Sequence, residues 1–130
     1  MQSIVVITPP NITLKYFMKK LDLYYQIDVV SDDRIVINDG GRYIAINLDD
    51  YITEEYDEKE LDVISQIIEQ PKFFLIEFTH LDLLKEVIPF CVDEPGFLVD
   101  NDHGDILSGQ QFLLKLKKNP AWDWRMTHSA

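Results

Sequence analysis

Hydrophobic residues near the start of the chain follow first a strand pattern and then a helical one. Residues 3–7 form a mostly β-branched run without interruption, which is typical of a buried strand. Leu14, Phe17, Met18 and Leu21 then recur at i, i+3, i+4 and i+7, so they share one face of a predicted helix.

Three runs that alternate between apolar and polar residues come next, over 25–30, 34–38 and 42–48. An aspartate pair at 32–33 separates the first two runs, and an Asp-Gly-Gly sequence at 39–41 separates the last two. Glycine adopts positive φ without a steric cost, so the second connection is a strong turn signal. The pattern predicts an antiparallel meander of three short strands.

The second half of the chain interleaves helical patterns with strands. Each helical pattern keeps its apolar residues on one face, and the longest strand is mainly aromatic and aliphatic, as in the centre of a sheet. These helical faces and strands are predicted at residues 61–68, 72–78, 84–88, 97–99, 106–107 and 112–116.

Three of the predicted helices carry the spacing of a capping box at their start. In this motif a side chain at the N-cap accepts a hydrogen bond from the backbone three residues on, and the third residue bonds back. The three pairs are Asp57 with Glu60, Thr79 with Asp82, and Ser108 with Gln111.

Together the patterns predict a single α+β domain over residues 1–130. We expect a mixed, mostly antiparallel sheet of about five to six strands, with helices packed mainly on one face. The length of 130 residues is typical of one domain. Residues 121–130 are expected to form a frayed tail, whose Trp122 and Trp124 either pack back onto the sheet or anchor an interface.

Charge separates this chain from an average globular protein. There are 23 Asp and Glu residues against 12 Lys and Arg, which gives a formal net charge of −11. Such a field repels nucleic-acid phosphates and anionic lipid, and it attracts basic proteins and other cations. The excess also keeps a protein soluble, which is its simplest explanation. We expect no binding to nucleic acid or membranes.

The single cysteine, Cys91, excludes an intramolecular disulfide and favours a reducing compartment. Residues 1–8 lack the basic start of a secretory signal, and no apolar run approaches the roughly 20 residues that span a bilayer. We therefore expect a cytoplasmic protein. Because Cys91 stands among apolar neighbours, an inert thiol is expected rather than a nucleophile. The chain has no phosphate loop, dinucleotide fingerprint or paired metal-cysteine motif, so neither a cofactor nor an enzyme is predicted.

Acidic residues are concentrated between positions 49 and 62, where only Lys59 opposes them. Several fall in the first turns of a predicted helix, where the helix dipole favours them. The remaining excess indicates a surface for a cationic partner, with two tyrosines as aromatic anchors. The predicted partner-binding residues are Asp49, Asp50, Tyr51, Glu54, Glu55, Tyr56, Asp57 and Glu58.

A second polar segment, residues 100–105, reads Asp-Asn-Asp-His-Gly-Asp. Its candidate metal ligands are Asp100, Asp102, His103 and Asp105. The spacing departs from a calcium-binding loop, and these residue types also suit an ordinary hairpin turn or a binding loop. If this segment adjoins the acidic residues 49–62 in space, the two form one large acidic surface.

The chain resembles a class of bacterial proteins in its size and charge. It also resembles them in its acidic run with tyrosines, its 99–104 loop and its Trp122-Asp123-Trp124 end. These are the small acidic immunity proteins that bacteria use against their own polymorphic or contact-dependent toxins. The resemblance implies tight binding to a basic toxin, often a nuclease, whose active site is blocked.

Our leading hypothesis is therefore a cytosolic protein that neutralises a basic protein partner. One alternative is a small metal-dependent enzyme or metal-binding protein that uses the loop at 100–105. Another is a structural or assembly subunit that self-associates through an exposed sheet edge.

Overall fold

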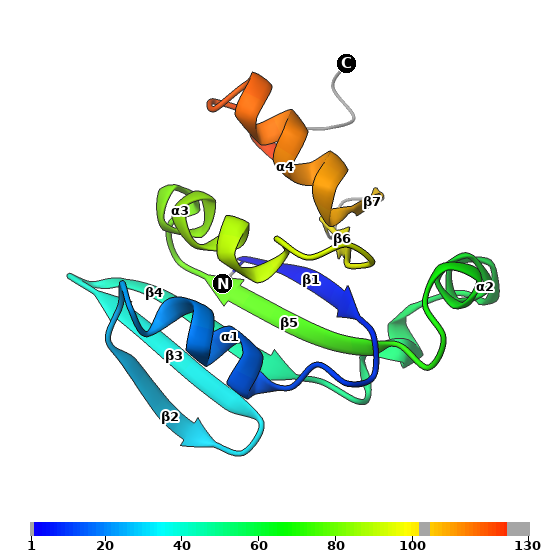
Figure 1. Ribbon diagram of the computed structural model, residues 1–130, viewed down its shortest axis with the longest axis horizontal. Coiled ribbons are helices and arrows are strands. Elements are labelled where there is room, and N and C mark those ends of the chain that lie inside the picture. Colours follow the sequence, from blue (N-terminus) through cyan, green and yellow to red (C-terminus); the bar gives the residue numbers. More distant parts are fainter. Residues whose placement is uncertain (1, 102–104, 125–130) are drawn as a thin grey trace.

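A seven-stranded sheet runs through the computed structural model, which describes residues 2–101 and 105–124 (Figure 1). The strand order is β2-β3-β4-β5-β1-β6-β7, and each neighbouring pair is antiparallel. The strands are β1 (Gln2–Thr8), β2 (Ile27–Ser31), β3 (Arg34–Asp39), β4 (Arg42–Leu48), β5 (Lys72–Phe78), β6 (Leu98–Asp100) and β7 (Ile106–Ser108). The helices are α1 (Leu14–Leu21), the 3₁₀ helix η1 (Ile52–Glu55), α2 (Glu58–Ile67), α3 (Leu81–Cys91) and α4 (Gly109–Lys118).

The first strand occupies a central position although it comes first in the chain. β1 pairs along its whole length with β5, where Val5 lies opposite Leu75, and along its second half with β6. The meander of β2, β3 and β4 continues the sheet beyond β5 through the pairing of β4 with β5. The chain order of the strands therefore differs from their spatial order, which no local pattern predicts.

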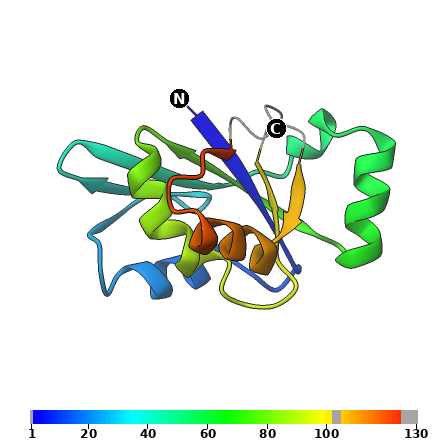
Figure 2. The same cartoon turned by 90° about the horizontal axis from the view of Figure 1, so that it is seen from above.

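Helices α1, α3 and α4 cover one face of the sheet (Figures 1 and 2). Phe17 of α1 packs edge-on against Phe74 of β5, with ring centroids 4.8 Å apart. Phe112 of α4 packs against Trp124 at 5.0 Å, and both side chains are fully buried. This layer holds the larger of the two hydrophobic cores, because the inward residues of five strands meet three apolar helix faces there.

Within the described part of the chain, the opposite face of the sheet is covered at one end only. Val5, Ile7 and Phe73 point to this side and form a second, smaller core with Ile64 and Ile68 from the region of α2. Figure 2 shows α2 at one end of the sheet, apart from α1, α3 and α4. The rest of this face stays accessible, as is common for one side of an antiparallel sheet.

Two of the three predicted capping boxes are confirmed, at the starts of α2 and α4. The third prediction, at Thr79 and Asp82, is wrong, because α3 has His80 as its N-cap. The Thr79 hydroxyl instead accepts a 2.9 Å hydrogen bond from the backbone N–H of Tyr43 in β4. The Thr79 side chain, which the local pattern assigned to the start of the helix, therefore bonds to a distant strand instead.

The predicted α+β fold is confirmed, with a sheet slightly larger than expected and, over the residues that the structure describes, three of the four α-helices on one face. The packed chain also extends further than the predicted tail allowed. Trp124 is fully buried and Trp122 packs 5.8 Å from it, so the two tryptophans pack back onto the core. Residues 125–130 lie outside the described part of the chain.

Candidate functional site: an acidic pocket on the open sheet face

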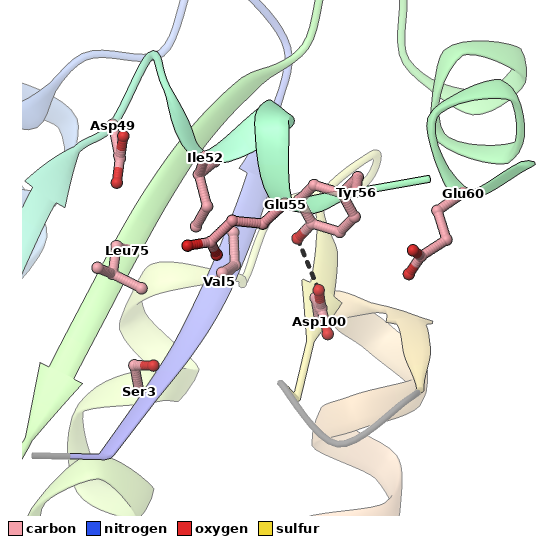
Figure 3. Close-up of a pocket in the computed structure, with 9 residues that line it drawn as sticks. All are labelled: Ser3, Val5, Asp49, Ile52, Glu55, Tyr56, Glu60, Leu75 and Asp100. Carbon is pink, nitrogen blue, oxygen red and sulfur yellow. Dashed lines mark hydrogen bonds between the residues drawn. The ribbon is translucent and has the colours of Figure 1, made fainter. Parts of the chain in front are cut away.

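A pocket of about 420 Å³ lies where the open sheet face meets η1 and the start of α2 (Figure 3). Five separate segments contribute to its wall, so residues from positions 3 to 100 meet there. The pocket is lined by Ser3, Val5, Asp49, Ile52, Glu55, Tyr56, Glu60, Leu75 and Asp100.

The floor of the pocket is made by the central strands. Ser3 and Val5 of β1 point to the same side because side chains alternate along a strand. Leu75 is the register partner of Val5 on β5, so these two side chains lie next to each other. Ile52 of η1, only 6% exposed, adds a further apolar group above them. The floor is therefore largely apolar.

Asp49 and Glu55 come from the segment that joins β4 to α2. The backbone N–H of Asp49 bonds to the carbonyl of Phe73 at 3.0 Å, which extends the pairing of β4 with β5 past the end of β4. The Asp49 carboxylate accepts a 3.0 Å bond from the Tyr51 N–H, which turns the chain into η1. One turn later Glu55 extends over Val5 at the mouth of the pocket (Figure 3).

Tyr56 and Asp100 close the side of the pocket toward β6. The Tyr56 hydroxyl donates a 2.6 Å hydrogen bond to the Asp100 carboxylate (Figure 3). The Tyr56 ring also packs 5.6 Å from the Phe73 ring, so it is held by an apolar contact at one end and a polar contact at the other. Asp100 is 9% exposed, which makes it the most enclosed carboxylate of the pocket.

Glu60 enters the pocket from the first turn of α2. Its side chain accepts a 3.2 Å bond from the Asp57 N–H, and its own N–H donates to the Asp57 carboxylate at 2.7 Å. This reciprocal pair is the capping box, and it holds Glu60 on the side of the helix that faces Asp100 (Figure 3). One acidic side chain therefore both caps α2 and lines the pocket.

Four of the nine lining residues are carboxylates and none is basic. Within residues 2–101 and 105–124, however, no group of three or more acidic, histidine or cysteine side chains converges as metal ligands do. The carboxylates are spread around a volume instead of meeting at one point. This arrangement suits a cation with the size of an organic group.

Beyond the pocket the open sheet face continues in polar residues. Arg34 of β3 donates to Asn47 at 2.6 Å and to Glu77 at 3.3 Å. Asn47 also donates to Glu77 at 3.2 Å, so the guanidinium charge of Arg34 is matched within its own network. This polar patch borders the pocket through Glu77, the register partner of Ser3.

Three of the eight predicted partner-binding residues line the pocket: Asp49, Glu55 and Tyr56. The other five lie outside its lining on exposed positions of the same segment, and Tyr51 is 77% exposed. These five are Asp50, Tyr51, Glu54, Asp57 and Glu58. Asp57 has a structural task, because its side chain is the N-cap of α2.

Sequence reasoning missed Glu60 as a pocket residue, although it counted Glu60 in the capping box. The spacing of the capping box carried a usable signal, since it places Glu60 on a defined side of the helix start. Sequence reasoning also missed four further lining residues, Ser3, Val5, Ile52 and Leu75. Only the polar Ser3 at the head of an apolar strand hinted that this strand borders an accessible surface.

Of the four candidate metal ligands at 100–105, two lie within the described residues and two lie outside them. Asp100 belongs to the pocket, and Asp105 donates its N–H to the Asn101 side chain at 3.1 Å. The Asn101 amide in turn donates to the Trp124 carbonyl at 3.4 Å, which connects this loop to the end of the packed chain. Asp102 and His103 lie outside the described residues.

Cys91 lies at the end of α3 and is fully buried in the larger core. Burial raises the pKa of its thiol, and the negative charge of Asp93 raises that pKa further. Both effects keep the sulfur protonated and disfavour a thiolate nucleophile.

No family model, no curated protein and no solved structure matches this chain. Among the described residues, no helix combines the length and apolar character that crossing a membrane requires.

Proposed function

We propose that this protein is a cytoplasmic binding protein that neutralises a basic protein partner, as bacterial immunity proteins neutralise toxins. The observation that supports the proposal is the pocket itself, in which four carboxylates surround an apolar floor and no lining residue is basic. A basic side chain of the partner enters this pocket.

The pocket matches the two halves of a lysine or arginine side chain. Both residues carry an apolar stem below a cationic head. The stem packs on Val5 and Leu75, and the head faces the carboxylates at the rim. Arginine fits better, because its planar guanidinium donates several hydrogen bonds in fixed directions and serves more than one carboxylate.

The exposed acids around the pocket have a different task from the acids inside it. Asp50, Glu54 and Glu58 stand in solvent, where a single ion pair adds little affinity. Their combined field raises the rate at which a cationic partner arrives, and added salt weakens that effect. Tyr51, which is 77% exposed, gives the partner an aromatic contact beside these charges.

Neutralisation follows from competition for the same cations. A nuclease holds nucleic-acid phosphates with Lys and Arg side chains. An acidic surface that pairs with those side chains occupies the site and excludes the nucleic acid. The protein acts by covering a surface of its partner, and it performs no chemical step itself.

The test is an affinity capture with three versions of the tagged protein. Wild type, the pocket variant Glu55→Gln/Glu60→Gln and the control Asp22→Asn/Glu94→Gln are each incubated with lysate of the native host at low salt. Both variants lose the same amount of negative charge, and the control acids are exposed residues outside the pocket lining. Bound proteins are eluted with a salt gradient and identified by mass spectrometry.

We expect wild type and the control to retain one stoichiometric basic protein that elutes only at high salt, and the pocket variant to release it much earlier. Glutamine keeps the capping box, so this loss will not come from unfolding of α2. Recovery of no specific protein, or equal retention by all three versions, contradicts the proposal.

A further inference from the structure

Exposed apolar side chains are concentrated around the edge strand β2. Leu23 and Tyr24, just before the strand, are 79% and 63% exposed. Val29 and Val30, within it, are 61% and 60% exposed. Four large hydrophobic side chains are thus exposed within eight residues of chain, and of these the Tyr24 ring also stacks on Phe90 with centroids 4.8 Å apart.

The backbone of β2 has one open side. Among the described residues, β2 is the last strand in the sheet order and pairs with β3 alone. An edge strand presents a row of N–H and C=O groups that another strand can pair with. The edge at the other end of the sheet is shorter, because β7 has three residues and continues directly into α4.

Charge decides which strand fits at this edge. Asp28 lies within β2, and Asp32 and Asp33 form its turn to β3, all three exposed. A second copy of the chain would bring its own aspartates and its net charge of −11 against them. A cationic strand meets no such repulsion.

We propose that the β2 edge is a second docking surface, where an extended basic segment of the partner protein adds to the sheet as a further strand. Main-chain hydrogen bonds supply the affinity, and alternate side chains supply the selection. Apolar side chains of the added strand contact Val29 and Val30, and basic ones face Asp28 and Asp32. The proposal rests on the proposed function for the basic character of the partner, but the strand addition does not need the pocket.

The test uses the full chain, labelled with ¹⁵N, and two synthetic peptides. The first is a short capped peptide of alternating lysine and valine. The second has the same sequence with every backbone nitrogen methylated, so it keeps charge and apolar groups but lacks hydrogen-bond donors along both edges. Chemical shifts and amide hydrogen exchange are measured for residues 27–31 with each peptide.

We expect the first peptide to shift the β2 resonances and to slow exchange of its outward amides, and the second to do neither. Charge reversal by Asp28→Lys/Asp32→Lys should weaken binding of the first peptide on the order of tenfold. At β2 the pocket variant Glu55→Gln/Glu60→Gln should respond to the first peptide as wild type does, because its changes lie on another surface.

Equal responses to both peptides would mean that charge alone attracts them, and the proposal would fail. It would also fail if β2 gave no response, or if the protein alone were dimeric by sedimentation with its β2 amides already protected. A failure at β2 together with a lysate partner that still depends on Glu55 and Glu60 leaves the proposed function intact. The reverse result rejects the pocket and keeps the edge.

Discussion

Tyr56 and Asp100 stand 44 residues apart in the chain, and a 2.6 Å hydrogen bond joins the hydroxyl of the first to the carboxylate of the second. The bond connects the segment before α2 to β6. It brings Asp100, the first residue of the polar loop, against the acidic run at 49–62. The acidic run and this one residue of the loop therefore line the same pocket.

Removing this hydrogen bond should destabilise the fold and loosen the pocket. Tyr56→Phe keeps the ring contact with Phe73 but takes the donor from a carboxylate that is 9% exposed. We expect a loss of about 1–3 kcal/mol in the free energy of unfolding, measured by urea denaturation. The control Tyr51→Phe, at a 77% exposed side chain, should stay within about 0.5 kcal/mol of wild type. Equal losses in both variants would contradict a special role for the Tyr56 hydroxyl.

Two substitutions of Glu60 should separate its structural role in the helix cap from the role of its charge in the pocket. Glu60→Ala removes both, since it breaks the capping box of α2 and takes one carboxylate from the pocket. Glu60→Gln removes only the charge, because glutamine also serves as the third residue of the motif. We expect thermal unfolding to show a loss of roughly 0.5–1 kcal/mol for alanine and almost none for glutamine.

Both Glu60 variants should bind the cationic partner more weakly than wild type. A glutamine variant that binds as tightly as wild type would remove Glu60 from the binding site, whatever its effect on the helix.

The companion variant Asp57→Ala should behave in the opposite way. It should lower stability by about 1 kcal/mol, because the N-cap is lost, while the four pocket carboxylates remain.

Alkaline conditions should reveal the contact between α1 and the segment after α3. Burial raises the pKa of Tyr16 above its ordinary value of 10.0, and the hydrogen bond that Tyr16 donates to Asp93 raises it further. The folded state thus holds the phenol proton more tightly than the unfolded state does. The stabilisation is fully present below pH 10 and is lost as pH rises above it.

Tyr16→Phe removes this titration, so its stability should fall less between neutral pH and the range above pH 10 than that of wild type. Urea midpoints of the two proteins over this pH range measure the difference. Parallel curves would show that Tyr16 ionises in the folded state as freely as in the unfolded state.

Trp124 should be one of the costly positions to truncate. Its side chain is fully buried and packs against Phe78, Phe112 and Trp122. We expect Trp124→Ala to lower the free energy of unfolding by about 3–5 kcal/mol in urea denaturation. Leu114→Ala, at a 53% exposed position of α4, should cost less than about 0.5 kcal/mol. A small loss in the free energy of unfolding for Trp124→Ala would show that this segment is a frayed tail, as its position in the sequence indicated.

Local signals in the sequence predicted local structure well. The capping boxes at Asp57 and Ser108 formed because their partners lie three residues away in the same helix. The same signal failed at Thr79, because the N–H of Tyr43 from another strand bonds to its hydroxyl. The fold class followed from the periods of the apolar residues, whereas β7 was indicated only by the apolar pair at 106–107, because three residues are too few to show a period.

The pocket was beyond reach for a different reason. Its acids were visible as a cluster in the sequence, and Asp49 and Glu55 were named as binding residues. Its floor depends on β1 lying between β5 and β6, which places Ser3, Val5 and Leu75 beneath those acids. That order is set by the packing of the whole sheet, so no window of sequence contains it.

The central place of β1 also governs how the protein assembles while it is being synthesised. β1 is synthesised before its partners β5 and β6, which begin at residues 72 and 98. We expect the β2–β4 meander, whose contacts are local, to form before then and to expose the side of β4 that β5 later occupies. The apolar run of β1 meanwhile has no sheet to enter. We therefore expect nascent chains to be prone to aggregation at this stage, and a chaperone that shields residues 2–8 during synthesis should raise the yield of folded molecules.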